Sequence, residues 1–142
     1  MSSTFSSDLS ANYCMDHVYS TICATGASSP GSNWIAVQLI PGTHVGAVAV
    51  HNRRDAYAYM LGSFEVWVGA SAGDMSSESA ARCGEASYDE QSEPDPYVIQ
   101  CVGAMSSESV TWVTVRQTTC PSTCIFALAE IDVAVELSLI HI

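Results

Sequence analysis

The chain of 142 residues is long enough for one domain with a sizeable hydrophobic core. Hydrophobic residues make up 48% of it and charged residues only 13%, which excludes a disordered chain. The formal net charge is −11, with no lysine and four arginines, so the sequence offers no basic surface for nucleic acid or for an anionic membrane.

Short alternating hydrophobic segments predict strands along most of the chain. Residues 13–33 show no clear period and are predicted to be irregular loops. Strands are predicted at 34–40 and 47–51 around the turn signal Pro41-Gly42, then at 63–69, 97–102 and 110–117, with a possible short strand at 4–5 and a long loop at 70–95. A last strand at 125–135 is expected to bury Ile125, Ala127, Ala129, Ile131, Val133 and Val135.

No segment shows helical periodicity, and no apolar run is long enough to span a bilayer. Several short strands separated by turn residues predict an all-β sandwich or barrel. The second strand ends in four polar residues, Asn52, Arg53, Arg54 and Asp55, which hold half of the arginines. A charged loop presented by a rigid β scaffold is a common binding site, so this loop is the first candidate.

Six cysteines in a small, serine-rich chain indicate disulfides and an oxidising compartment. Zinc is the competing interpretation, because Cys120 and Cys124 have the spacing of two ligands, but no second Cys or His pair completes a tetrahedral site. The first ten residues lack the basic and apolar regions of a signal peptide. We therefore expect a fragment or mature domain of a larger secreted protein.

The sequence does not predict an enzyme. It contains no Gly-x-Ser-x-Gly, His-Glu-x-x-His or phosphate-binding glycine loop. His51 is interpreted as a satisfied rim or core residue, and the acidic pair Glu93 and Asp95 as solvated loop residues. Catalysis would need groups in complementary roles, and none stands out in this sequence.

Seven short motifs follow one another along residues 2–136. They are SSTF at 2–5, STICAT at 20–25, NWIAVQL at 33–39, VHNRRD at 50–55, EVWVG at 65–69, the cysteines at 83 and 101, and LAEIDV at 128–133. In order and spacing they resemble the F-type lectin (fucolectin) family, within the wider discoidin-like, galactose-binding-like domains. The resemblance implies a jelly-roll β-sandwich over residues 1–136. The apolar residues 137–142 are interpreted as a non-native tail.

The resemblance also implies a sugar site. The family binds fucose with a His, an Arg-x-Asp and a further basic residue, in which the arginine donates hydrogen bonds and the aspartate fixes it. Arg53 and Asp55 match the Arg-x-Asp, whereas Thr25 and Met60 occupy the positions of the other two donors. Arg54 stands at the usual glycine and is a candidate replacement donor. The implied function is an extracellular lectin-like domain that binds fucose or a related glycan on glycoproteins at a degenerate site.

The resemblance also implies a structural Ca²⁺ ion. Asp16 and Glu130 match two carboxylates that hold the ion in the family, whereas His17 and Val18 replace a glycine and an asparagine. Backbone carbonyls or water would then complete the oxygen shell.

The resemblance bears on the cysteines as well. It implies a Cys83–Cys101 disulfide. The usual partner of Cys23 is replaced by Ala129, so Cys14, Cys120 and Cys124 remain as its candidates. One consistent set is Cys14–Cys23 with Cys120–Cys124.

Two other functions keep the same fold. In the first, the domain is an adhesion or interaction module without a sugar ligand, and Arg53 and Asp55 only clamp their loop. In the second, it is a phospholipid-binding discoidin domain, which would need basic and apolar loop tips. The acidity of the chain disfavours the second.

Overall fold

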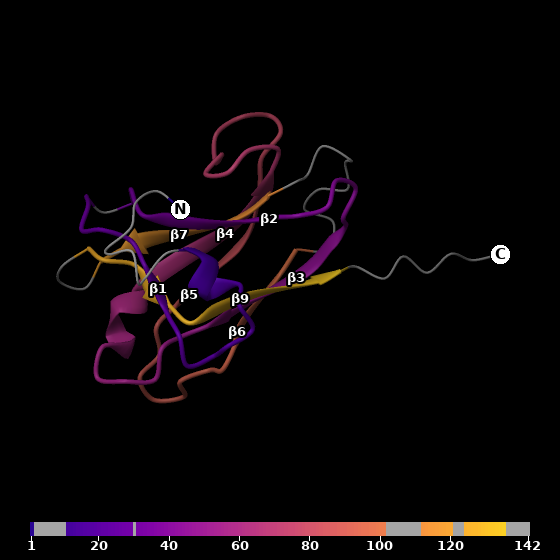
Figure 1. Ribbon diagram of the computed structural model, residues 1–142. Helices are drawn as coiled ribbons and strands as arrows, with labels where there is room; N and C mark the ends of the chain where they lie inside the picture. The colour runs from indigo at the N-terminus through magenta and orange to yellow at the C-terminus, as the bar shows by residue number, and fades with distance from the viewer. Residues whose placement is uncertain (2–10, 30, 102–111, 121–123, 136–142) are drawn as a thin grey trace.

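The alternating segments form two antiparallel sheets that pack face to face (Figure 1). The computed structural model describes residues 1, 11–29, 31–101, 112–120 and 124–135. One sheet has the order β2 (Trp34–Gln38), β7 (Trp112–Thr119), β4 (Ser63–Gly69) and β5 (Ala81–Ser87), and the other β6 (Tyr97–Gln100), β3 (Val45–His51) and β9 (Glu130–Val135). A small sheet joins β1 (Cys23–Ala24) to β8 (Ala127–Leu128), and two 3-10 turns are η2 (Ala11–Cys14) and η3 (Ala58–Leu61).

The core lies between the two larger sheets. In Figure 1, β2, β7 and β4 lie above β9, β3 and β6. Because alternate strand residues point to opposite faces, every second side chain of β4 and β7 enters this space. The fully buried residues include Ile35, Phe64, Val66, Val113 and Val115 from one sheet and Val48 and Val50 from the other. The predicted all-β sandwich is confirmed.

Three predicted elements are wrong in detail. The segment 13–33, predicted to be irregular, contains the two-residue strand β1, which pairs with β8. The loop predicted at 70–95 contains β5, an edge strand that pairs only with β4 among the described residues. The single last strand predicted at 125–135 is divided into β8 and β9 at Ala129. Val135, which is expected to be buried, is 58% exposed. Phe126 and Glu130, which the predicted alternation places on the outer face, are fully buried. The short strand predicted at 4–5 and the tail 137–142 lie outside the described residues.

All six cysteines form disulfides, and none is free. The pairs are Cys14–Cys23, Cys83–Cys101 and Cys120–Cys124, with Cα–Cα separations of 5.4, 4.7 and 4.6 Å. Cys83 lies in β5 and Cys101 directly follows β6, so this bridge joins edge strands of the two sheets. The zinc interpretation of Cys120 and Cys124 gives way to a disulfide.

The loop between β4 and β5 covers the outer face of the larger sheet. The backbone N–H of Gly73 donates to the hydroxyl of Thr114, which is only 2% exposed. Gly73 has φ +77°, and a Cβ there would lie 2.6 Å from two atoms of the Trp34 ring. The loop can approach the sheet this closely only because residue 73 lacks a side chain.

Gly73→Ala is therefore expected to lower the free energy of unfolding by about 2–3 kcal/mol, because a steric clash adds to an unfavourable backbone conformation. Gly42→Ala is the matched control: Gly42 has φ +85° and nothing within 4 Å of its added Cβ. This control should show only the backbone cost of about 1 kcal/mol. Urea unfolding of both variants measures the difference, and equal losses would refute the clash.

Candidate functional site

Arg53 is held in a fixed position by its own loop. Its Nε donates to Oδ1 of Asp55 at 2.7 Å and its Nη2 to Oδ2 at 2.6 Å, a two-pronged charge-assisted pair. The ring of Tyr57 lies 5.3 Å from the guanidinium carbon. The hydrogen bond from Arg53 holds the pKa of Asp55 below its usual value. Nη1 has no partner among the described residues, so its two N–H groups and the second N–H of Nη2 are the donors that Arg53 can offer to a ligand.

A second charged group surrounds His51 at the end of β3. Nδ1 of His51 lies 3.3 Å from Asp95 and Nε2 lies 3.0 Å from Asp132. The ring of Tyr19 packs 4.5 Å from the imidazole, and its hydroxyl donates to Asp132. Arg54 forms an ion pair with the other oxygen of Asp95. Asp95 is therefore an organising residue of this rim, which corrects its interpretation as a solvated loop acid.

Most residues of these two groups line two adjoining hollows in the surface. The larger has a volume of about 630 Å³, and His51, Arg53, Arg54, Asp55 and Asp95 line it together with Tyr19, Ser20 and Ile22. The smaller, of about 280 Å³, shares Arg53, Arg54 and Asp95 and adds residues such as Tyr88, Glu93 and Tyr97. A concave site with apolar walls and a few convergent polar groups is the usual form of a small-ligand site.

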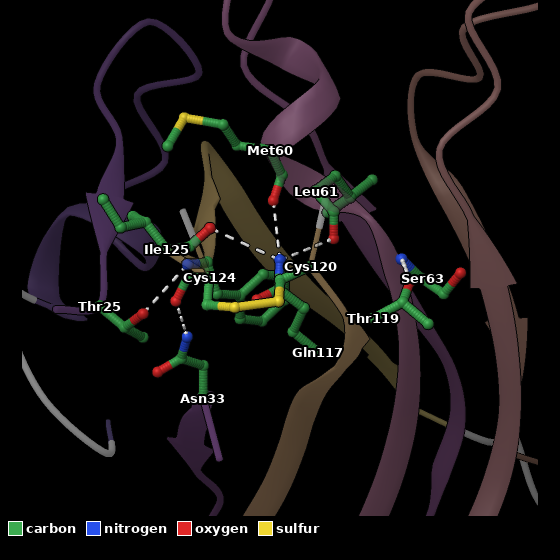
Figure 2. The surroundings of a disulfide bond; sticks show 11 residues. Thr25, Asn33, Met60, Leu61, Ser63, Gln117, Thr119, Cys120, Cys124 and Ile125 are labelled. Carbon is green, nitrogen blue, oxygen red and sulfur yellow. Dashed lines mark hydrogen bonds between the residues drawn. A yellow bond between two sulfur atoms is a disulfide. The ribbon is translucent and has the colours of Figure 1, made fainter. Parts of the chain in front are cut away.

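Thr25 and Met60, the other two predicted sugar contacts, lie outside the two hollows. Thr25 is fully buried, and its hydroxyl accepts the backbone N–H of Phe126 at 3.0 Å. Met60 presents its carbonyl to Nε2 of the buried Gln117 at 2.8 Å. Figure 2 shows both residues in the hydrogen-bond network around the Cys120–Cys124 disulfide. Neither lines either hollow. Arg53, Arg54 and Asp55 are thus the predicted sugar residues that the structure brings together.

The two carboxylates expected to hold Ca²⁺ meet where the first loop crosses β9. Glu130 is fully buried, and its Oε2 accepts the backbone N–H of His17 at 3.4 Å. Asp16 accepts the N–H of Val18 at 2.9 Å and the hydroxyl of Thr21 at 2.8 Å. The Val18 hydrogen bond lowers the pKa of Asp16, whereas burial raises that of Glu130. Asp16 is therefore engaged on both oxygens by its own loop.

The side chains that gather around Glu130 do not match an all-oxygen calcium shell. His17, Glu130 and Asp132 each offer one donor atom, and the three atoms lie within 4.8 Å of one another. Ca²⁺ takes six to eight oxygen ligands, whereas one of the three side chains in this group offers an imidazole nitrogen. Val18 supplies no side-chain oxygen in place of an asparagine. These residues therefore suit a smaller ion that accepts nitrogen ligands, and they suit Ca²⁺ less well.

No family model matches this sequence, and no curated protein matches it. Solved structures match its fold. The chitosan-binding module 1 of a chitosanase/glucanase from Paenibacillus sp. IK-5 is 16% identical, with a TM-score of 0.70 over 93% of this chain and 89% of that one. The lectin domain of lectinolysin, solved with Lewis B antigen, is 22% identical, with a TM-score of 0.67 over 93% and 87%.

A third similar structure is the family 32 carbohydrate-binding module of NanJ from C. perfringens, solved with galactose. It is 13% identical, with a TM-score of 0.68 over 92% of this chain and 88% of that one. The chain therefore has the fold shared by these carbohydrate-binding modules and lectin domains.

Proposed function

We propose that this domain binds a glycan in the hollows beside Arg53 and catalyses no reaction. Arg53 carries the proposal, because Asp55 fixes two of its nitrogens and leaves Nη1 for a sugar hydroxyl or ring oxygen. A donor that is already oriented loses little conformational entropy on binding. The ligand class that follows from the Arg-x-Asp arrangement is fucose or a related neutral sugar of a glycoprotein.

Three further observations support the proposal. The similar structures are described as binding chitosan, Lewis B antigen and galactose, respectively. Tyr19 and Tyr88 line the hollows and supply flat apolar surfaces for the faces of sugar rings. Three disulfides suit an extracellular location, in which such a domain would be one module of a larger protein. No helix among the described residues is long and apolar enough to cross a membrane.

The alternative is an adhesion or interaction module without a sugar ligand. It draws support from the same contacts, because Asp55 neutralises Arg53 and Asp95 neutralises Arg54. The buried Thr25 and the position of Met60 also leave two donors of the family pattern unreplaced. The two functions differ in whether a free sugar in solution competes for the site.

Arg53→Ala tests the proposal on a glycan array followed by titration of the best ligand. Loss of a charge-assisted hydrogen bond should weaken glycan binding about 10- to 100-fold. Arg53→Lys keeps the charge but not the planar fork, and should recover only part of the affinity. The fold should survive, because Asp55, which loses its partner, is 54% exposed.

Arg82→Ala is the matched control, since Arg82 also forms ion pairs with carboxylates but lies on β5, away from the hollows. Its glycan affinity should equal that of the unmodified domain. Equal affinity in Arg53→Ala would refute the proposed site. An array on which the folded domain binds no glycan would instead favour the interaction module.

A further inference from the structure

His17, Glu130 and Asp132 form a three-donor cluster, and none of the three lines either hollow. Nδ1 of His17 lies 3.9 Å from Oε2 of Glu130 and 3.8 Å from Oδ1 of Asp132. His17 comes from the loop after η2, whereas both acids belong to β9. Successive strand residues point to opposite faces, so residues 130 and 132 lie on the same face of β9, toward this loop. The fold thus brings one imidazole and two carboxylates to a single point.

Glu130 is the second observation that indicates a ligand. Its side chain is fully buried, and Oε1 has no hydrogen-bond partner among the described residues. A buried charge is costly unless it is paired or coordinates a metal. A cation bound by this carboxylate would balance its buried charge.

Asp132 is oriented as a metal ligand usually is. Its Oδ2 accepts the hydroxyl of Tyr19 at 2.9 Å and lies 3.0 Å from Nε2 of His51. Both contacts use the same oxygen, which leaves Oδ1 toward His17. Outer hydrogen bonds of this kind fix the direction of ligating carboxylates in metal sites.

The donor atoms also select among metals. Imidazole nitrogen is a good ligand for Zn²⁺ and other late first-row ions, and a poor one for Ca²⁺, which prefers oxygen. We propose that His17, Glu130 and Asp132 bind one divalent transition ion, of which Zn²⁺ is the representative, in preference to Ca²⁺. The site then fastens the first loop to β9. This assignment does not depend on the glycan site.

His17→Gly is the decisive variant. His17 has φ +59°, a conformation that glycine adopts without strain, so the loop should keep its path when the imidazole is removed. Asparagine also tolerates this conformation and offers an oxygen in place of the nitrogen. His17→Asn is therefore expected to reduce the preference for Zn²⁺ over Ca²⁺. His44→Asn removes a different exposed imidazole and is the matched control.

The experiment is isothermal titration of ZnCl₂ and, separately, CaCl₂ into the tag-free domain after treatment with EDTA. We expect one Zn²⁺ per chain, a weaker response to Ca²⁺, and a melting temperature that rises by several degrees with Zn²⁺. His17→Gly should weaken Zn²⁺ binding about 100-fold, since even outer-shell changes cost 10- to 100-fold. His44→Asn should bind Zn²⁺ as the unmodified domain does.

Three results would overturn the assignment. The first is tighter binding of Ca²⁺ than of Zn²⁺, which would restore the calcium site expected from the family. The second is Zn²⁺ affinity that is unchanged in His17→Gly, whatever the affinity of His44→Asn. The third is no binding of either ion by the folded domain. Each result is read from metal titration alone, so none of them bears on whether Arg53 binds a glycan.

Discussion

Phe64→Ala is expected to lower the free energy of unfolding by about 3–5 kcal/mol, the usual cost of removing a buried aromatic ring. Phe64 is fully buried in β4, and its ring meets that of Tyr97 edge-on, with centroids 6.0 Å apart. Since Tyr97 belongs to β6 of the opposite sheet, the cavity would open between the two layers. Urea unfolding followed by tryptophan fluorescence measures the loss.

Phe64→Leu is the matched control for this prediction. Leucine keeps most of the apolar volume, so the loss should stay below about 1.5 kcal/mol. Tyr97 also lines the smaller hollow, and its hydroxyl accepts the backbone N–H of Asp89. The alanine variant should therefore weaken the binding of any ligand in that hollow more than the leucine variant does. A loss under 1 kcal/mol for Phe64→Ala would contradict the central place of this contact.

The double variant Cys83→Ala/Cys101→Ala is expected to lose about 3 kcal/mol, the chain-entropy value for a loop of this length. The two cysteines are 18 positions apart in sequence. Their bridge ties β5 to the end of β6, along the side where the two sheets are open. Cys101 is 2% exposed, so the loss of its sulfur also removes core packing.

Cys120→Ala/Cys124→Ala provides the comparison, because these cysteines are only 4 positions apart. The shorter loop predicts a smaller loss, of about 2 kcal/mol. Thermal and urea unfolding under oxidising conditions measure both variants. If the shorter bridge contributed as much as the longer one, loop length would not govern the stabilisation in this domain.

The strands that could be predicted from the sequence are those with one face in the core. β4 alternates Phe64, Val66 and Val68 with Glu65 and Trp67, and the structure buries the first three. β5 escaped prediction because its sequence, ARCGEAS, has no such alternation, and none of its residues is buried. An edge strand needs fewer apolar residues, so its pattern resembles that of a loop.

The prediction of one continuous strand through β8 and β9 is wrong for the opposite reason, because too many of its residues are buried. Residues 126–131 are all buried, because β1, β3 and the first loop cover them from several sides. A segment enclosed in this way shows no period of two. The burial of Glu130 in particular could not be inferred from its neighbours in sequence, although its role as a carboxylate near Asp16 followed from the resemblance.

Much of the candidate site depends on contacts between distant segments. Arg53 and Asp55 are two residues apart, so their pairing could be anticipated. The contacts of His51 with Asp95 and Asp132 span 44 and 81 positions and require the register of β3 with β6 and β9. Tyr19 comes from a loop with no periodic signal at all. Only the assembled sheet brings these side chains together.

The pairing of the arginines has a consequence for which ligands can approach. All four arginine side chains form ion pairs with carboxylates, namely Arg53 with Asp55, Arg54 with Asp95, Arg82 with Glu65 and Glu85, and Arg116 with Glu65. The remaining acidic charge, which makes the net charge −11, is thus not offset by any unpaired arginine. Such a field slows the encounter with sialylated or sulfated glycans and leaves neutral sugars unaffected. Added salt screens this repulsion over about 10 Å at 0.1 M, so the charge of the whole domain acts as a filter on which glycans reach the rim.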